Sequence, residues 1–468
     1  MQQRRLALDE TRPIWRTMLI FLLPLMASNF LQSASSTFNS IYLGQLIGVR
    51  ALAAASGFFP IVFFMISFFV GLASASSVLI GQAYGARDED RIESVAGTTL
   101  TLAIGLGLVV GVLGALFITP LLHLIGMPAD VFALAVRYAR VTFLSLPLLF
   151  VYLAYTTFVR GTGDTRTPFV ALIVSTAVSL VVTPALIEGW LGLPKLGIVS
   201  AAVANIVGSA AALAFMLIAL AAEKNPLAFD AGLARHMRIM PKVVVLLLRL
   251  GIPTGVQFVM ISLAEIAVIS LVNRFGSSAT AAYGAVNQIV SYVQFPAISI
   301  GISASIFGSQ AIGAKRFDRL GHIAKAAVGL NWAIGAILIT LVYVFDRDIL
   351  RLFVTDPTVV ELAHGLLEIT LWSYVIFGTS AVLSGQMRSS GSVLWPTLLS
   401  IVSIWAVEVP VAYGLAPHLG LTGVWIAYPV AFCVGLALQS AYYFGVWRRQ
   451  RLTTLLDDLD GKELPVAT

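Results

Sequence analysis

The sequence has 468 residues, of which 58% are hydrophobic and only 11% are charged, with a formal net charge of +6. Ordinary soluble domains have roughly a quarter of their residues charged, so this composition excludes a soluble protein. The single cysteine, Cys433, also excludes a disulfide within the chain.

Twelve apolar stretches follow one another, and each is long enough for a helix to cross about 30 Å of hydrocarbon. Strands are disfavoured because a stretch such as LTLAIGLGLVVGVLGALFI is apolar on every face. The prediction is therefore an all-α polytopic membrane protein with 12 transmembrane helices. The expected spans cover residues 17 to 44, 52 to 80, 95 to 118, 131 to 157, 169 to 188, 196 to 222, 243 to 273, 279 to 306, 323 to 345, 359 to 384, 396 to 416 and 421 to 447.

Basic residues set the expected orientation. If the N-terminus is inside, 22 of the 29 Lys and Arg fall on the inner side, among them Arg4, Arg5, Arg12 and Lys462. The positive-inside rule then places both termini in the cytoplasm of a plasma (bacterial inner) membrane, with an uncleaved first helix. Anionic lipid near the basic loops accounts for the net charge without nucleic acid.

The first predicted helix carries a polar stripe. Its residues recur at spacings of three and four, which is the period of one helix face. Such a face lines water or hydrogen bonds another helix, and the sequence does not decide between the two. The candidates for a substrate cavity here are Asn29, Gln32, Ser36 and Asn39.

The chain repeats itself at an offset near 228. GQAYGARD at residues 81 to 88 returns as SQAIGAKR at 309 to 316, and Pro24 matches Pro253. The loop is most simply explained as a tight cytoplasmic turn. Because each half has an even number of helices, we expect two lobes of six helices related by a pseudo-twofold axis along the membrane normal. The N-lobe is expected at residues 1–225 and the C-lobe at 226–468, with a cytoplasmic linker at about 222–242.

Two glutamates stand out inside the predicted spans of the C-lobe. Glu265 lies in the seventh helix and Glu408 in the eleventh, both slightly outward of the midplane. Carboxylates within membrane helices are costly and usually face a cavity, where they bind protons or cations. Burial disfavours the ionised form, so either residue could switch its charge as water enters or leaves. The alternative is that each pairs with a neighbouring polar group and only joins two helices.

Other polar and aromatic residues of the C-lobe could line the same cavity. Ser262 is one turn from Glu265, and Trp405 is three residues from Glu408. Aromatic rings attract organic cations, although most aromatics in membrane helices only face lipid. The C-lobe candidates are Gln257, Ser262, Tyr283, Asn287 and Trp405.

These motifs together resemble the multidrug and toxic compound extrusion (MATE) family. The resemblance rests on GQAYGARD and SQAIGAK, on RGTGDTRTP with MRSSGSVLWPT, and on LGIVSAAVAN with LGLTGVWIAY, and it covers residues 14 to 447. It implies a secondary antiporter in which protons or sodium ions drive export of lipophilic or cationic compounds through a cleft between two lobes.

The first lobe departs from one branch of that family. Where a proton-coupled bacterial branch has an Asp in the first helix, this chain has Phe38-Asn39-Ser40, and Thr183 stands where an Asp often precedes Pro184. Coupling is therefore expected to fall to Glu265 and Glu408. Protons are slightly preferred, and Na⁺ at the same glutamates remains open because hard cations prefer oxygen ligands.

Three other classes of function fit the sequence less well. A flippase for a lipid-linked anionic precursor needs buried basic residues in a central cleft, and few lie at helix centres. An enzyme needs a nucleophile, base or metal cluster, but the five histidines lie near helix ends and no cofactor is expected. A channel needs a filter-like loop, which the sequence does not contain.

Overall fold

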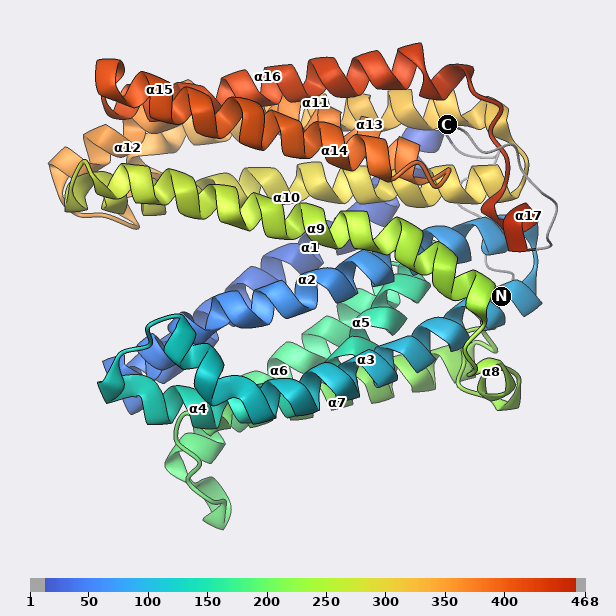
Figure 1. The fold of residues 1–468 in the computed structure, drawn as a ribbon, viewed down its shortest axis with the longest axis horizontal. Coiled ribbons are helices and arrows are strands. Elements are labelled where there is room, and N and C mark those ends of the chain that lie inside the picture. The colour runs from blue at the N-terminus through green and yellow to red at the C-terminus, as the bar shows by residue number, and fades with distance from the viewer. Residues whose placement is uncertain (1–12, 460–468) are drawn as a thin grey trace. The chain divides into compact units, whose positions relative to one another are not determined.

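The computed structural model describes residues 13–459, and Arg4, Arg5, Arg12 and Lys462 of the orientation argument lie outside that range (Figure 1). Within it, eleven helical segments are long and apolar enough to cross a membrane, and a pair of helices bent by 50° can form a twelfth. All twelve expected spans have a helical counterpart, so the prediction of an all-α polytopic membrane protein is confirmed.

Internal contacts divide the chain into two compact units. The first contains residues Ala27–Ile252. Its helices α6 and α7 pack against each other, and α3 packs against α5. The elements that lie in it wholly or in part are α1 (Ile14–Tyr42), η2 (Leu43–Ile47), α2 (Val49–Ala86), α3 (Glu89–Leu124), α4 (Ala129–Leu144), α5 (Leu146–Gly161), α6 (Arg166–Glu188), η3 (Trp190–Gly192), α7 (Val199–Ala222), α8 (Ala231–His236) and α9 (Pro241–Asn273).

Among the described residues, the second unit contains 253–459 together with 13–26. Helices α10, α13 and α16 run side by side through it (Figure 1). Beyond α9, its elements are α10 (Ser277–Gly313), η4 (Phe317–Arg319), α11 (Leu320–Arg351), α12 (Pro357–Thr370), η5 (Leu371–Ser373), α13 (Tyr374–Arg388), α14 (Leu394–Val402), η6 (Ser403–Glu408), α15 (Val409–Leu419), α16 (Leu421–Gly445), η7 (Trp447–Arg449) and α17 (Leu455–Leu459).

Two helices each contribute to both units. Helix α1 changes unit after Met26, two residues beyond Pro24, and α9 changes at Pro253. The expected boundary at residues 225 and 226 therefore differs from the division by contacts. The reason is that the linker packs on α3, where the Thr98 hydroxyl donates to the Arg238 carbonyl at 3.1 Å.

The fourth span of each half is broken at the same place in the repeat. Helix α4 ends before Ser145 and α5 begins after it, while η5 interrupts α12 and α13 up to Ser373. These two serines are 228 positions apart. Pro147 follows the first break, and its ring and missing N–H favour a helix start there.

The turns of the two halves share left-handed residues. Arg87 (φ 65°) caps the end of α2, and Lys315 (φ 57°) lies in the turn that follows α10. The two residues are 228 positions apart. Residues other than glycine rarely adopt this left-handed backbone conformation. Its recurrence at matching positions is therefore structural evidence of duplication. Gln82 and Gln310, the repeated glutamines before these turns, are both fully buried and so belong to helix packing.

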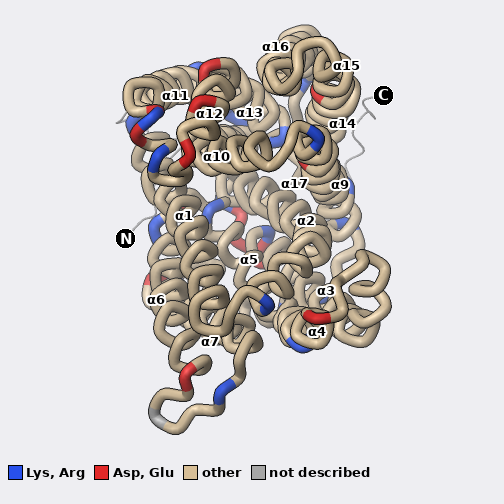
Figure 2. The backbone as a smooth tube through the Cα atoms, turned by 90° about the vertical axis from the view of Figure 1, so that its left-hand side faces the viewer, with Lys and Arg blue, Asp and Glu red and all other residues tan. Residues whose placement is uncertain are grey.

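Apolar side chains cover the outside of the helices, as lipid requires. Leu116 of α3 and Ile218 of α7, for example, are 67% and 69% exposed. Figure 2, which looks along the helices, shows acidic and basic residues close together at α11 and α12, and Arg347 of α11 pairs with Glu361 of α12. The chain is a multi-pass membrane protein.

Candidate functional site

Glu408 is buried within the second unit, with 7% of its surface exposed. It ends η6, a π-helical turn that interrupts the α-helical eleventh span between α14 and α15. Pro410 follows, and Ser403 at the start of the turn donates its hydroxyl to the Ala431 carbonyl at 2.6 Å. A π-helical turn inside a membrane helix is uncommon and often marks a functional site.

Two hydrogen bonds fix the register of α9 against this span. The indole N–H of Trp405 donates to the Met260 carbonyl at 3.1 Å, and the Tyr413 hydroxyl donates to the Ala267 carbonyl at 3.0 Å. Glu265 lies between the two acceptors along α9, and Glu408 lies between the two donors. At roughly 1.5 Å per residue, their depths along the helices differ by only about 3 Å.

The two glutamates interact electrostatically with each other. Glu265 is exposed at the protein surface of its unit, and Glu408 is not. Within residues 13–459, neither carboxyl group forms a hydrogen bond or an ion pair with a basic side chain. Two like charges at this depth repel each other, so the pair is stable only if a proton or another cation reduces its charge.

Aromatic residues surround the buried glutamate. The hydroxyl groups of Tyr283 and Tyr428 are 2.9 Å apart, and the ring of Tyr283 stacks on Trp425 with 5.9 Å between centroids. Both tyrosines interact electrostatically with Glu408, as does Tyr374. We call Tyr283, Tyr374 and Tyr428 the tyrosine cluster. Its hydroxyl groups can hydrogen bond either form of a carboxyl group or a hydrated cation.

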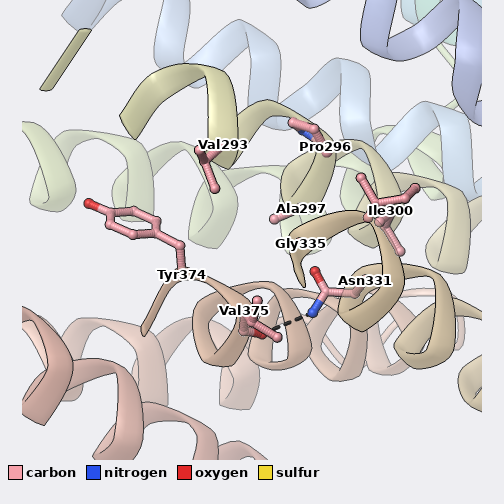
Figure 3. A pocket seen from close by; sticks show the side chains of 9 residues that line it. Val293, Pro296, Ala297, Ile300, Asn331, Gly335, Tyr374 and Val375 are labelled. Carbon is pink, nitrogen blue, oxygen red and sulfur yellow. Dashed lines mark hydrogen bonds between the residues drawn. The ribbon is translucent and has the colours of Figure 1, made fainter. Parts of the chain in front are cut away.

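A small cavity of about 10 Å³ lies beside the tyrosine cluster, large enough for about one water molecule (Figure 3). Its polar residues are Tyr374 and Asn331, and Asn331 donates its amide to the Val375 carbonyl at 2.9 Å. In Figure 3 the hydroxyl of Tyr374 points away from Asn331. Tyr374 thus both lines the cavity and interacts electrostatically with Glu408.

The other candidates of the second unit have separate surroundings. Gln257 accepts a hydrogen bond from the guanidinium of Arg388, toward the start of α9. Ser262 is half-buried one turn before Glu265. Asn287 is exposed one turn beyond Tyr283 and interacts with its hydroxyl. The structure thus gathers Glu265, Glu408 and Tyr283 together, while Arg388 engages Gln257.

The polar stripe of α1 belongs to the first unit. Gln32 and Ser36 are exposed at the surface of this unit, whereas Asn29 and Asn39 are half-buried. Ser36 matches Glu265 at the offset of 229 that relates the prolines of α1 and α9. The ionisable group at this position is therefore present in the second unit alone.

The sequence does not predict that the three residues of the tyrosine cluster lie together. Of its three residues, only Tyr283 is among the candidates that the sequence indicates. The three residues come from α10, α13 and α16, which are separated by long stretches of chain. No spacing in the sequence reports such a contact.

The sequence model of the family described as MatE matches this chain twice, at residues 24–185 and 253–414. The two matches are offset by 229 positions, in agreement with the internal repeat.

Several known proteins are similar along almost the whole chain. A Bacillus subtilis protein named probable multidrug resistance protein YoeA is 48% identical, over 95% of this chain and 96% of its own. The multidrug export protein MepA of Staphylococcus aureus is 23% identical, over 98% and 99%. A crystal structure of the Vibrio cholerae MATE transporter VcmN has a TM-score of 0.85 at 20% identity, over 93% and 98%, which shows a shared fold.

Proposed function

Since the chain belongs to the MatE family, we propose that it is a secondary antiporter that exports lipophilic or cationic drugs by alternating access. The names of YoeA and MepA, which refer to multidrug resistance and multidrug export, support this substrate class. The proposal excludes an enzymatic role and places the protein in a bacterial plasma membrane with both termini cytoplasmic, as the basic loops favour.

One observation carries the proposal of coupling. Glu408 is buried, has Glu265 as its charged neighbour and forms no ion pair in the described part of the chain. A proton or a cationic substrate bound at this pair removes the electrostatic cost of two neighbouring negative charges inside the membrane. Its release restores that cost. Competition between the two for the same carboxylates is the simplest physical basis for exchange transport.

We assign the proton as the preferred coupling ion. A proton alone neutralises a buried carboxyl group, whereas Na⁺ is a hard cation that needs several oxygen ligands. The oxygen atoms proposed for this site are the carboxylates of Glu265 and Glu408 and the hydroxyls of the tyrosine cluster. Sodium is thus the second choice at the same residues.

The proposed substrate surface adds polar and aromatic residues near these acids. Tyr283, Asn287, Trp405 and Ser262 lie in the second unit around the glutamates or one turn from them. Aromatic rings and carboxylates together attract organic cations without demanding one shape. The remaining proposed residues are Asn29, Gln32, Ser36 and Asn39 of α1 and Gln257 of α9.

The test is uptake of ethidium, a lipophilic cation, into proteoliposomes of the purified full-length protein. A proton gradient and a sodium gradient are imposed separately, each with an ionophore control that collapses it. We expect uphill ethidium movement with the proton gradient. Movement only down the ethidium gradient would indicate a channel, and translocation of a labelled lipid-linked precursor without ethidium transport would indicate a flippase.

A further inference from the structure

The first unit contains an open apolar groove with a volume of about 140 Å³. Helices α3, α5 and α7 form its walls, and the linker closes one end with Phe229 and Met237. An apolar cavity of about 150 Å³ stays dry in other proteins and takes an apolar guest. The other residues that line the groove are Leu100, Ile104, Val151, Tyr155, Leu213 and Leu217.

The groove lies at the depth of one lipid leaflet. Leu217 and Leu213 are five and nine residues before the end of α7, which places them roughly 8 and 14 Å from it. Tyr155 is six residues before the end of α5, or roughly 9 Å. Because half of the hydrocarbon core is about 15 Å thick, the groove spans the acyl-chain region on the linker side.

Tyr155 lines the groove with its ring, while its hydroxyl is buried. Its side chain is only 2% exposed, and its hydroxyl has no hydrogen-bond partner among the described residues. The hydroxyl interacts electrostatically with Asp230, so it lies toward the linker end of the groove. The groove therefore presents an apolar surface, which suits an acyl chain.

The linker has the composition of a membrane-surface segment. Phe229 and Ile239 are 57% and 62% exposed, and the basic residues Arg235 and Arg238 are exposed beside Met237. Apolar and basic side chains side by side are typical of segments that lie in the interface and attract anionic lipid.

The acidic residues near this rim already have partners. Asp230 accepts a hydrogen bond from the backbone N–H of Leu233 as the N-cap of α8, and Glu93 pairs with His236 at 3.2 Å. The arginines therefore remain the charges that an added headgroup would meet.

We propose that this groove binds an anionic phospholipid from the cytoplasmic leaflet. One acyl chain lies between α3, α5 and α7, and the headgroup pairs with Arg235 and Arg238. The site uses the cytoplasmic assignment of the linker made above but does not depend on drug export or on Glu265 and Glu408.

The test uses phosphatidylglycerol and phosphatidylcholine probes that carry a photoreactive diazirine in one acyl chain. Each is added in trace amount to the full-length protein in phosphatidylcholine nanodiscs, and labelled peptides are mapped by mass spectrometry. Each arginine near an anionic headgroup contributes about fivefold in binding, so the anionic probe is expected to label the α7 peptide with Leu213 and Leu217 many-fold more.

Matched variants separate this site from ordinary surrounding lipid. Arg235→Gln with Arg238→Gln should abolish the headgroup preference, whereas Arg137→Gln with Arg140→Gln, the same spacing on α4, should not. Leu213→Trp fills the groove and should block labelling, and Leu113→Trp, on an exposed face of α3, should leave it unchanged. If Leu213→Trp does not fold, Leu217→Phe takes its place.

Equal labelling by both probes would overturn the proposal, as would full labelling in the groove-filling variant. Either result would mean that only unselective surrounding lipid is present. Since labelling is measured without a gradient, its failure is distinct from a failure of drug export.

Discussion

At the scale of single residues, the decisive feature is a carboxyl group without a counter-charge. Glu408 lies in the interior of the second unit with Glu265 as its charged neighbour. Replacing a buried charge by a neutral group usually helps stability, so two acids kept at this depth indicate a function in cation or proton binding. The register that brings them together depends on hydrogen bonds from Trp405 and Tyr413 to the α9 backbone.

Trp405→Phe tests that register. The change removes the indole N–H that donates to Met260 and keeps an aromatic ring, so we expect a loss of about 1 kcal/mol in the free energy of unfolding. It is measured as a lower melting temperature in detergent. Trp372→Phe is the control because this indole is 46% exposed and makes no side-chain hydrogen bond within the described residues. Equal melting temperatures for the two variants would contradict the account.

At the scale of elements, the linker is part of the first unit because α3 lets it approach closely. A Cβ added to Gly97 would lie 2.3 Å from the carbonyl oxygen of His236, which is inside contact distance. Glycine at this position allows the backbone of α3 to pack against the backbone of the linker. Helix α8 and the linker residues after it therefore lie against α3.

Gly97→Ala should therefore destabilise the protein by about 1–3 kcal/mol, as overpacking of a buried site does. Limited proteolysis within the linker measures the effect, and cleavage should be faster in this variant. Gly105→Ala, on the same helix with open space around its added Cβ, should instead be neutral or stabilising by up to about 1 kcal/mol. Unchanged linker cleavage in Gly97→Ala would show that the close contact is unimportant.

The sequence predicts these elements well and their junctions poorly. Long apolar stretches located all twelve spans, because membrane helices must satisfy their own backbone groups. Counting residues along the spans also placed Glu265 and Glu408 at similar depth. The π-helical turn before Glu408 was not predicted, and neither was the contact of Tyr283 with Tyr428, since both depend on packing between distant helices. The same limit explains why the linker was expected to separate the halves.

At the scale of the whole molecule, the two repeated halves of the chain exchange the first parts of their first helices, α1 and α9. The start of α1 belongs to the second unit and the start of α9 to the first, so each unit contains a segment from the other half of the chain. Met18, Phe21 and Leu25 of α1 join the core of the second unit, where Phe21 meets Phe307 edge to face at 5.5 Å. The second unit is thus incomplete without residues 14–26 of α1.

Phe21→Ala should loosen the second unit, although the substitution lies in the first helix. Loss of this buried ring is expected to cost about 3 kcal/mol or more. Hydrogen exchange should become faster in the α10 peptide around Phe307. Phe30→Ala, nine residues later in α1 at a position 56% exposed, is the control and should leave that peptide protected. Equal protection in both variants would contradict the exchange of helix halves.

The most direct measurement of the central claim is proton-driven ethidium transport by Glu265→Gln and Glu408→Gln in proteoliposomes. The account predicts that each variant loses proton-driven transport by about tenfold or more, within the usual range of coupling free energies. Glu188→Gln is the control, because Glu188 lies at a helix end and accepts a hydrogen bond from Trp190 at 2.6 Å. Normal transport by both variants with unchanged ion dependence would contradict the assignment of coupling to these two glutamates.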